Sequence, residues 1–362
     1  MKKVLFIIDD LGGGGAERVF VNIANGFAEN NVAVDMLLGK KQGVYLPMLH
    51  PSVNVSETGS TNFFVYLRRF GNIFKKNNYS HIFTASHYNS AAAILAKKFS
   101  GISSKVYQTH HFCYPEKRKL AYWKGDMLVK ALYYFTAPSA DKIIAVSKGS
   151  LEWLRKFSHR KLPNGTFIHN PVLDQNIYQL AKEEIDFPVD VTGKTILLNV
   201  GRLNEEKDQL TLIKAFALYK QKNAAALLFI LGAGPTGKQL EQYIRSHGLQ
   251  NEVFLMGFQQ NPYKWMAGCN VFVLSSVCEG FGNVIVEAMA FGKTIVSTDC
   301  PAGPAEILEN GKLGYLCPVQ NPEALANAIE KAITQPLNSN ELVEASKKYY
   351  TNTVVEKYLQ TL

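Results

Sequence analysis

The chain has 362 residues, of which 47% are hydrophobic and 19% are charged, a composition typical of a soluble globular protein with a large core. No apolar stretch approaches the roughly 18–20 residues that span a membrane, and the length predicts two domains of roughly 100–200 residues each. The net charge of +9 lies in residues 1–190, which hold 24 of the 39 basic and 15 of the 30 acidic residues. This one-sided excess indicates an anionic partner, such as a membrane surface, an acidic acceptor or nucleic acid, unless the lysines only keep the protein soluble.

Buried strands and helices alternate along the whole chain. The first run, residues 4–8, predicts a buried strand rather than a secretory leader, because it is short and Asp9 and Asp10 end it. The alternation predicts two doubly wound α/β domains, each with a parallel sheet covered by helices on both faces. The predicted strands are residues 4–8, 32–38, 81–86, 105–111, 142–147, 195–200, 226–231, 253–257, 271–274 and 294–297. Helical patterns between them include residues 17–29, 89–99, 209–221, 238–247 and about 283–291.

The domain boundary is predicted from a segment rich in chain breakers. Residues 171–193 contain Pro171, Pro188, Gly193 and a run of acidic residues, which is typical of a hinge. We therefore expect an N-terminal domain at residues 1–180 and a C-terminal domain at 181–340. The segment 341–362 predicts a final helix whose tyrosines pack back on the N-terminal domain.

The cysteines and histidines argue against disulfides and against a bound metal. The five cysteines are odd in number and form no C-x-x-C pair, which favours unpaired thiols in a reducing cytoplasm. The sequence also lacks an H-x-x-x-H motif, a Cys/His cluster and a D-x-D motif. We therefore expect no metal held by the protein.

Four glycines at positions 12–15 follow the first strand and open the first helix. Glycines at such a junction let the backbone cradle phosphate oxygens at the helix N-terminus. Gly12 and Gly14 match two positions of the dinucleotide-binding fingerprint, but the third position is Glu17. The loop predicts a phosphate contact, and NAD binding and a plain tight turn remain as alternatives.

Two further strand ends carry candidate binding residues. Arg202 and Lys207 follow the strand at 195–200, close enough to converge on one anion. A departing diphosphate needs such compensation, although a solvated pair of surface cations is the alternative. Gly257 and Phe258 close the strand at 253–257, where the ring could lie beside a base or pack in the core.

Glu279 and Glu287 bracket the most informative segment of the chain. Seven residues separate them, and the segment joins a buried strand to a helix, where ligands of open α/β sheets bind. Gly280 and Gly282 let the backbone approach a ligand closely, and the helix start directs N–H groups at an anion. Ionised carboxylates accept hydrogen bonds from hydroxyl groups. The segment therefore predicts a site for a polyhydroxyl ligand that carries phosphate, such as a nucleotide sugar.

His110 and His111 end the strand predicted at residues 105–111. A histidine at the carboxyl end of a strand faces the crevice of an open α/β sheet. It could contact a sugar hydroxyl or share developing positive charge, and a purely structural role is the alternative.

Aromatic and basic residues mix at helical spacing in residues 63–76 and again in 117–124. Amphipathic basic helices of this kind lie on anionic membranes. Ordinary helices with a solvated basic face fit equally well, and no RNA-binding signature supports a nucleic-acid partner. The two stretches predict a peripheral membrane contact as one of two alternatives.

Taken together, these motifs resemble the retaining, nucleotide-sugar-dependent glycosyltransferases of family 4, which have the two-domain GT-B fold with a central crevice. The resemblance covers essentially the full length. Its strongest part is EGFGNVIVEAMAFGKTIVSTD at residues 279–299. The order GGGGAERV, NVGRLNEEKD, EGFGNVIVEA is more specific than any one motif, and CPAGPAEI at 300–307 looks like the family's closing motif.

The resemblance implies a role for each matching position. Glu279 would contact the donor sugar near the reacting carbon, and Glu287 would hold the ribose hydroxyls. Arg202 and Lys207 would bind the diphosphate. His111, or the neighbouring His110, would take the place of the family histidine. Further donor contacts would come from Gly13, Gly14, Gly15 and Ala16, from Gly257 and Phe258, and from the backbone of Gly280, Phe281, Gly282 and Asn283.

The resemblance also implies retaining sugar transfer without a metal or other cofactor. The donor, expected to be UDP-linked, would bind the C-terminal domain, and a glycan or lipid-linked acceptor would bind the basic N-terminal domain. We expect a cytoplasmic protein, peripheral on the inner face of the membrane, that serves surface polysaccharide or lipopolysaccharide synthesis. A nucleotide-sugar 2-epimerase, an NAD-dependent oxidoreductase and a non-catalytic glycan-binding protein are the alternatives.

Overall fold

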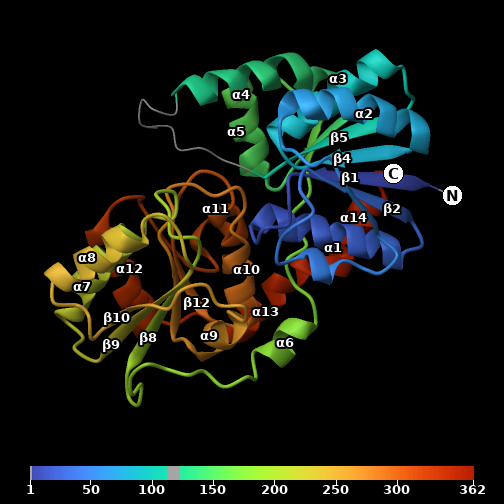
Figure 1. Cartoon of the computed structure of the whole chain (residues 1–362). Coiled ribbons are helices and arrows are strands. Elements are labelled where there is room, and N and C mark those ends of the chain that lie inside the picture. Colours follow the sequence, from blue (N-terminus) through green and yellow to red (C-terminus); the bar gives the residue numbers. More distant parts are fainter. Residues whose placement is uncertain (1, 112–122) are drawn as a thin grey trace. The chain divides into compact units, whose positions relative to one another are not determined.

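The computed structural model describes residues 2–111 and 123–362, and the chain forms two compact units (Figure 1). The first unit comprises Met1–Val172 and Tyr349–Leu362, and the second comprises Leu173–Lys348. The chain therefore leaves the first unit within the predicted hinge, but residues 173–180 and 341–348 belong to the second unit, unlike the predicted boundaries. The side chains of the basic segment 117–124 lie outside the described residues.

Local packing accounts for the shifted boundaries. The short helix α6 (Asn176–Leu180) packs within the second unit, where Asn261 Nδ2 donates a 2.7 Å hydrogen bond to the Leu180 carbonyl. The helix α13 (Ser339–Ser346) packs along α10 (Asn283–Ala290). Both segments follow polar or proline-containing stretches, so the sequence did not reveal which domain they join.

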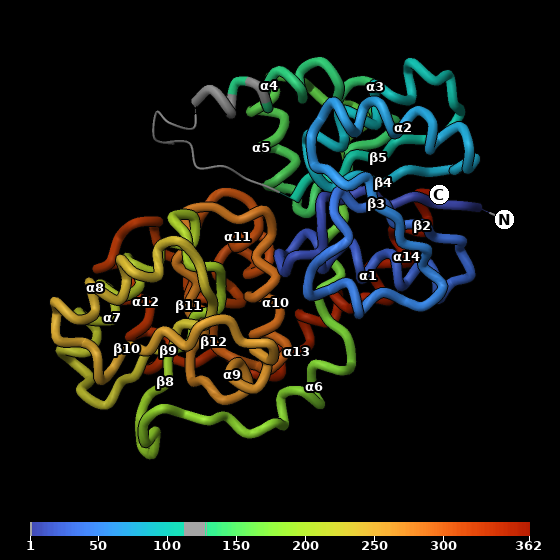
Figure 2. Tube along the Cα trace, in the orientation of Figure 1, coloured from blue at the N-terminus to red at the C-terminus, as the bar shows by residue number. Residues whose placement is uncertain are grey.

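The C-terminal segment returns to the first unit. Its helix α14 (Thr351–Leu359) lies along α1 (Gly15–Glu29), as the red and blue segments of the trace show (Figure 2). The helices approach closely at Gly26, where an added Cβ would lie 2.5 Å from a methyl group of Val355. Tyr107 donates its hydroxyl to the Thr361 carbonyl at 2.7 Å, which fixes the chain end on this unit.

The first unit contains a seven-stranded parallel sheet with the order β3-β2-β1-β4-β5-β6-β7. The sequence predicted five of these strands and missed β3 and β7, because both are short edge strands with few apolar residues. The strands are β1 (Lys3–Ile8), β2 (Ala33–Leu38), β3 (Asn54–Glu57), β4 (His81–Thr84), β5 (Lys105–His110), β6 (Lys142–Ala145) and β7 (Gly165–Phe167).

One helical layer covers each face of the first sheet. On one face, α1 and α14 pack against alternate strand residues such as Phe6. The other face, which includes Leu5 and Ile7, carries the remaining long helices of the unit. They are α2 (Phe63–Asn77), α3 (His87–Ser100), α4 (Trp123–Thr136) and α5 (Lys148–Ser158). The unit also has 3₁₀ turns at Leu46–Met48, on the side of α1, and at Ala137–Ser139.

The second unit contains a six-stranded parallel sheet with the order β10-β9-β8-β11-β12-β13. The prediction is confirmed to the residue for β8 (Thr195–Val200), β9 (Ala226–Leu231) and β11 (Val271–Leu274). The other strands are β10 (Val253–Leu255), β12 (Thr294–Thr298) and β13 (Tyr315–Cys317). The helices not yet named are α7 (Gln209–Lys220), α8 (Gly237–Ser246), α9 (Tyr263–Gly268), α11 (Pro304–Ile307) and α12 (Pro322–Thr334), with 3₁₀ turns at Glu309–Gly311 and Lys347–Tyr349.

Each sheet has a point where the strand order reverses direction. The reversal lies between β1 and β4 in the first unit and between β8 and β11 in the second. Loops that leave the carboxyl ends of two such neighbouring strands diverge and open a crevice, which is where open α/β sheets bind ligands. The predicted glycine loop follows β1, and the loops that carry Lys207 and Glu279 follow β8 and β11. Across the described residues, every helix is too short or too polar to cross a membrane.

Three histidines of the first unit predict a pH-dependent stability. Burial lowers the pKa of His81, His87 and His111 to about 4, below the usual value of about 6.5. Between these two values the unfolded chain binds more protons, so the free energy of unfolding falls as the pH drops from about 6.5 towards 4. Urea unfolding of the protein over this pH range measures the slope.

The variant His81→Gln should flatten this slope, because it removes one of the three protonation steps. His159→Asn is the matched control, since His159 is exposed and its left-handed backbone conformation suits asparagine. An unchanged slope in His81→Gln would contradict the assignment of the acid sensitivity to buried neutral histidines.

Candidate functional site

An ion pair joins the two loops at the reversal point of the second sheet. Lys207, from the loop after β8, places its Nζ 2.5 Å from Oε1 of Glu279, from the loop after β11. Ser276 donates its hydroxyl to the same Oε1 at 2.6 Å. The Glu279 side chain is only 9% exposed, so its charge depends on these two partners. The sequence predicted Lys207 and Glu279 as site residues, and the structure brings them into direct contact.

Backbone contacts hold the same two loops in register. Val277 N–H donates to the Glu206 carbonyl at 2.8 Å, and the Ser275 hydroxyl donates to the Lys207 carbonyl at 2.8 Å. Thr298, at the end of β12, donates its hydroxyl to the Ser276 carbonyl. These small hydroxyl residues were not predicted from the sequence. The signal for them was a Ser-Ser pair directly between a buried strand and Glu279.

The glycines of the neighbouring turns let backbones touch. A Cβ at Gly232 would lie 1.9 Å from the Gly201 carbonyl oxygen, and a Cβ at Gly303 would lie 1.6 Å from the Phe281 carbonyl oxygen. The first contact packs the β9 turn on the β8 turn. The second packs the turn before α11 on the 280–282 turn. Any side chain at these positions would push the two turns apart.

The segment 280–283 forms the entry to α10. Gly282 has a φ of +103°, which favours glycine, and it precedes α10 without a capping side chain. The Phe281 side chain is buried, so any ligand contact of this residue would come from its backbone. Glu287 lies in the second turn of α10 and is 5% exposed. Glu279 therefore lies in a loop and Glu287 in a helix, as the sequence predicted.

Arg202 and Phe258 are exposed at this edge of the sheet. The Arg202 side chain is exposed, and its carbonyl accepts a 3.1 Å hydrogen bond from Gln209 Nε2. Phe258 is 63% exposed and follows Gly257, whose carbonyl accepts from Gly232 N–H at 2.8 Å. The packed-ring alternative for Phe258 is therefore wrong. Both side chains are open to a ligand at the carboxyl ends of the strands.

The glycine loop of the first unit is held by the loop after β2. Gly43 has a φ of +123°, and a Cβ there would lie 2.1 Å from the Leu11 backbone. Leu11 N–H also donates to the Gln42 carbonyl at 3.0 Å. Of the four glycines, only Gly13 has a positive φ, at +108°, while Gly14 caps α1 and Gly15 begins it. The conformation that requires glycine is therefore at Gly13.

The two neighbouring histidines point to opposite faces of the first sheet. His110 is buried, its Nδ1 lies 2.9 Å from the Tyr133 hydroxyl, and its ring stacks on Trp153. These contacts with α4 and α5 give His110 a packing role. His111 instead lies beside Phe20 of α1, with Nε2 2.8 Å from the Thr109 hydroxyl. Since α1 begins at the glycine loop, His111 is the histidine on the side of that loop.

The charge states of the site groups suit an anionic, hydroxyl-rich ligand. Burial lowers the pKa of His111 to about 4, so its ring is neutral at neutral pH and can exchange hydrogen bonds with hydroxyls. Lys207 and Arg202 supply positive charge at the second unit's reversal point. No three His, Cys, Asp or Glu side chains gather to hold a metal ion within residues 2–111 and 123–362.

Two family models match the chain, one in each unit. The model for glycosyltransferase family 4 matches residues 13–173, and the model for glycosyl transferases group 1 matches residues 181–349. The first match ends close to the end of the first unit at Val172, and the second stays almost entirely within Leu173–Lys348. The two models therefore follow the structural division of the chain.

Curated relatives and solved structures agree with these models. A Campylobacter jejuni protein named N-acetylgalactosamine-N,N'-diacetylbacillosaminyl-diphospho-undecaprenol 4-alpha-N-acetylgalactosaminyltransferase is 34% identical over 57% of this chain, which spans about half (53%) of that relative's length. The alpha-1,3/1,6-mannosyltransferase ALG2 of Dictyostelium discoideum is 26% identical, with 94% of this chain and 91% of that protein covered. The Anabaena HepE structure in complex with UDP and glucose has a TM-score of 0.82 and 22% identity, with 100% and 99% covered. This likeness shows a shared GT-B fold.

The buried ion pair predicts a strong coupling between Lys207 and Glu279. The variant Lys207→Met should lower the free energy of unfolding of the second unit by about 1–3 kcal/mol, because it leaves a buried carboxylate with Ser276 but without its cation. The double variant Lys207→Met/Glu279→Gln should recover at least half of that loss. Chemical unfolding of the wild type, both single variants and the double variant measures the coupling energy.

The pair Lys222–Glu330 is the matched control on the surface of the same unit. Its Nζ–Oε2 distance is 2.7 Å, but the side chains are 62% and 42% exposed. Its coupling energy should stay below about 0.5 kcal/mol. Additive effects at Lys207 and Glu279, with no coupling beyond that of the surface pair, would contradict the prediction.

Proposed function

Because the chain belongs to the family 4 glycosyltransferases, we propose that it transfers a sugar from a nucleoside diphosphate sugar to a glycan or lipid-linked acceptor, with retention of configuration. The observation that carries the proposal is the junction of Lys207, Ser276 and Glu279 at the reversal point between β8 and β11. There a carboxylate and a cation lie where open α/β sheets bind ligands, and they suit a ligand that is rich in hydroxyls and carries phosphate.

The donor would bind to the second unit, with one group for each part of the molecule. Arg202 and Lys207 would hold the diphosphate, Glu279 the sugar hydroxyls and Glu287 the ribose hydroxyls. The base would lie by Gly257 and Phe258, whose ring is exposed. The remaining contacts would come from the backbone of Gly280, Phe281, Gly282 and Asn283. We favour uridine as the base, because the HepE structure of similar fold holds UDP.

The chemical step is proposed as substitution on one face of the sugar. The bond from the anomeric carbon to the diphosphate oxygen breaks through an oxocarbenium-like state. The acceptor oxygen forms the new bond on the same face, and its proton passes to the departing diphosphate. Arg202 and Lys207 would stabilise the charge that builds on the diphosphate, so we propose that the protein itself holds no metal for this task.

The first unit would contribute the acceptor side of the reaction. Its neutral His111 is the group we assign there, whereas the loop Gly13–Gly15 would supply further donor contacts, as the family resemblance implies. A lipid-linked acceptor is favoured, since the name of the Campylobacter relative contains a diphospho-undecaprenol substrate. We propose a role in surface polysaccharide or lipopolysaccharide synthesis, at the cytoplasmic face of a membrane.

Removal of either diphosphate cation should cost far more turnover than stability. Arg202→Ala should lower kcat/KM by roughly 10²–10³-fold, because one preorganised contact to the leaving group is lost. The donor is first identified by a thermal-shift panel of nucleotide sugars, since a ligand present at about 100 times its Kd stabilises the fold by about 2.7 kcal/mol.

Lys238→Ala is the control for this experiment, because Lys238 is an exposed lysine on α8 of the same unit. It should leave kcat/KM unchanged. Near-normal transfer by Arg202→Ala would overturn its role. Release of an epimerised nucleotide sugar without any acceptor would overturn glycosyl transfer and establish epimerisation instead.

Substitutions of the two glutamates should affect different quantities, UDP binding for Glu287 and turnover for Glu279. Glu287→Gln should weaken the binding of UDP at least about tenfold, because it loses a charge-assisted bond to the ribose. Glu279→Gln should bind UDP nearly as the wild type does but lose most of its turnover. Calorimetry with UDP and turnover with the donor measure the two effects, and equal UDP affinity of Glu287→Gln and wild type would exclude the ribose role.

A further inference from the structure

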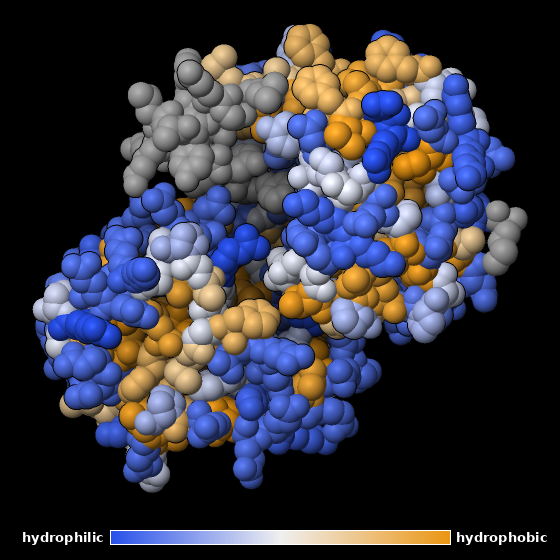
Figure 3. All heavy atoms as spheres, in the orientation of Figure 1, coloured by the Kyte–Doolittle hydropathy of each residue, from blue (hydrophilic) through white to orange (hydrophobic). Residues whose placement is uncertain are grey.

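Exposed aromatic side chains concentrate on one helical layer of the first unit. Phe64 on α2, Phe99 on α3 and Phe135 on α4 are 75%, 75% and 73% exposed. Met127 and Tyr134 of α4 are also exposed. The helices α2, α3, α4 and α5 pack in sequence on the same face of the sheet. Apolar atoms interrupt the hydrophilic surface over α2, α3 and α4 (Figure 3). We call these four helices the aromatic layer.

The aromatic layer is also strongly basic. The helices α2 and α3 contain six Lys or Arg residues and no Asp or Glu. Arg68 and Lys75 lie on the same stripe of α2 as Phe64, at helical spacings of four and eleven residues, and both are exposed. Lys98 is exposed directly beside Phe99. Exposed cations therefore lie on the same helices as Phe64 and Phe99.

The opposite layer of the same sheet shows neither property. The large apolar residues of α1 and α14, such as Phe20, Phe27 and Tyr358, are buried. In charge, α1 carries two acids and one base, and α14 carries one of each. The basic excess of the first 190 residues is thus concentrated on one face, which general solubility does not require.

A hollow between α4 and the end of α5 combines the two properties. Its volume is about 210 Å³. The Arg160 guanidinium lies 3.7 Å from the centre of the Tyr134 ring, and Lys130 Nζ lies 5.1 Å from the centre of the Phe157 ring. In each pair a cation lies above an aromatic ring. A lipid would place its phosphate headgroup by the cation and its acyl chains by the ring. The lining residues are Lys130, Ala131, Tyr134, Phe135, Phe157, Ser158 and His159.

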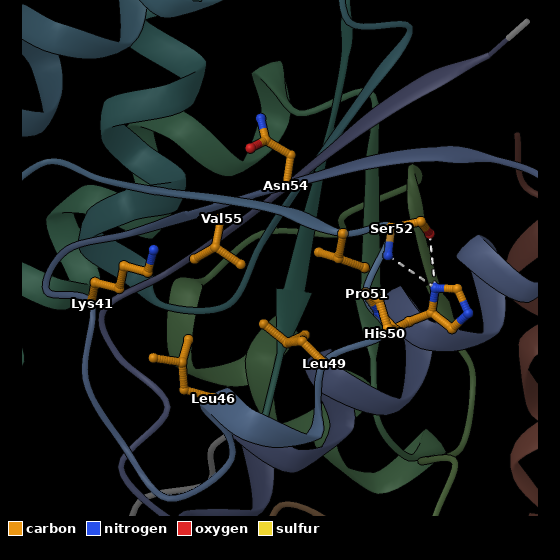
Figure 4. Close-up of a pocket in the computed structure, with 9 residues that line it drawn as sticks. Lys41, Leu46, Leu49, His50, Pro51, Ser52, Asn54 and Val55 are labelled. Carbon is orange, nitrogen blue, oxygen red and sulfur yellow. Dashed lines mark hydrogen bonds between the residues drawn. The ribbon is translucent and has the colours of Figure 1, made fainter.

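A larger hollow elsewhere on the first unit lacks this combination. It has a volume of about 510 Å³ and lies beside the edge strand β3 (Figure 4). The figure shows Leu46, Leu49 and Val55 in its wall, with Lys41 at one end. His50 is tied to Ser52 by a 2.8 Å hydrogen bond, and the wall contains no Phe, Tyr or Trp. This hollow offers no ring-and-cation pair.

We propose that the aromatic layer is the surface by which the protein rests on an anionic lipid bilayer. Phe64, Phe99 and Phe135 enter the interface between headgroups and acyl chains, and the basic side chains around them contact lipid phosphates. The proposal deepens the proposed function, because a bilayer is where a lipid-linked acceptor resides. Binding to a bilayer needs no turnover, so the two can fail separately.

The test is flotation of the full-length protein with vesicles of defined composition. Wild type should float with phosphatidylcholine vesicles that contain roughly 30% phosphatidylglycerol, and not with phosphatidylcholine alone. The variant Arg68→Ser/Lys75→Ser/Lys98→Ser should lower the partition coefficient by on the order of 100-fold, since each basic residue contributes about a factor of five. Phe64→Ser/Phe99→Ser/Phe135→Ser should lower it at least about tenfold, and its residual binding should vanish in roughly 0.5 M NaCl.

Controls separate this surface from general basicity and from misfolding. Met48→Ser removes an exposed apolar side chain beside the larger hollow, and Lys238→Ser with Lys357→Ser removes two exposed cations outside the aromatic layer. These variants should float as wild type does. Thermal unfolding should show that all variants are folded, as expected for exposed positions. Failure of wild type to float with anionic vesicles would overturn the proposal, as would equal binding of the aromatic-layer variants and the controls.

Turnover with a water-soluble acceptor distinguishes the two proposals. The aromatic-layer variants should keep wild-type turnover in solution, because none of these residues belongs to the donor site. Anionic-vesicle binding by a protein that transfers no sugar would leave the bilayer surface intact and overturn the proposed function. Loss of soluble turnover in the aromatic-layer variants would instead place these residues in the catalytic machinery and overturn a role limited to the bilayer.

Discussion

The Lys207–Glu279 ion pair is the interaction on which the candidate site depends. A carboxylate that is 9% exposed needs a cation and a hydrogen-bond donor, and Lys207 and Ser276 supply them. The pair also connects two loops that are far apart in the sequence but leave neighbouring parallel strands. A diphosphate sugar would offer each member of the pair a new partner, phosphate for the lysine and hydroxyl groups for the carboxylate. The site can therefore exchange partners on binding without leaving either charge buried alone.

Glycine contacts set the geometry around this pair. Gly232 and Gly303 lie so close to neighbouring carbonyl groups that no side chain fits. They bring the turns after β9 and β12 against the turns that carry Arg202 and Phe281. The result is a continuous rim of backbone along the carboxyl edge of the second sheet. Such a rim is suited to ligands that present many oxygen atoms, because backbone groups provide donors at fixed positions.

The sequence predicted the parts of this arrangement that follow from local patterns. Continuous apolar runs located β8, β9 and β11 to the residue, since buried parallel strands have this pattern. The short strands β3, β7 and β13 were missed, because β3 and β7 contain few apolar residues and β13 is only three residues long. Glu279 and Lys207 were predicted separately from loop chemistry, and their direct contact required the strand order. Ser276 and Thr298 were missed, because small hydroxyl residues are common and their role here depends on which carbonyl or carboxylate lies beside them.

Adjacent residues on a strand illustrate the same limit. His110 and His111 both remained candidates, although the family resemblance favoured His111, since a sequence pattern does not say which face lies towards the glycine loop. The structure separates them, because α4 and α5 cover one face and α1 covers the other.

The charge excess of the first 190 residues can likewise be interpreted only with the structure. It becomes informative once those charges lie on the helices that also expose Phe64, Phe99 and Phe135. The strand ends of the second unit and the aromatic layer of the first unit would then rely on different types of interaction. As proposed, buried and paired charges would select the donor, whereas exposed charges and rings would gain their binding energy from a wide lipid interface. Substitutions on the layer would then change where the enzyme works without changing which donor it binds.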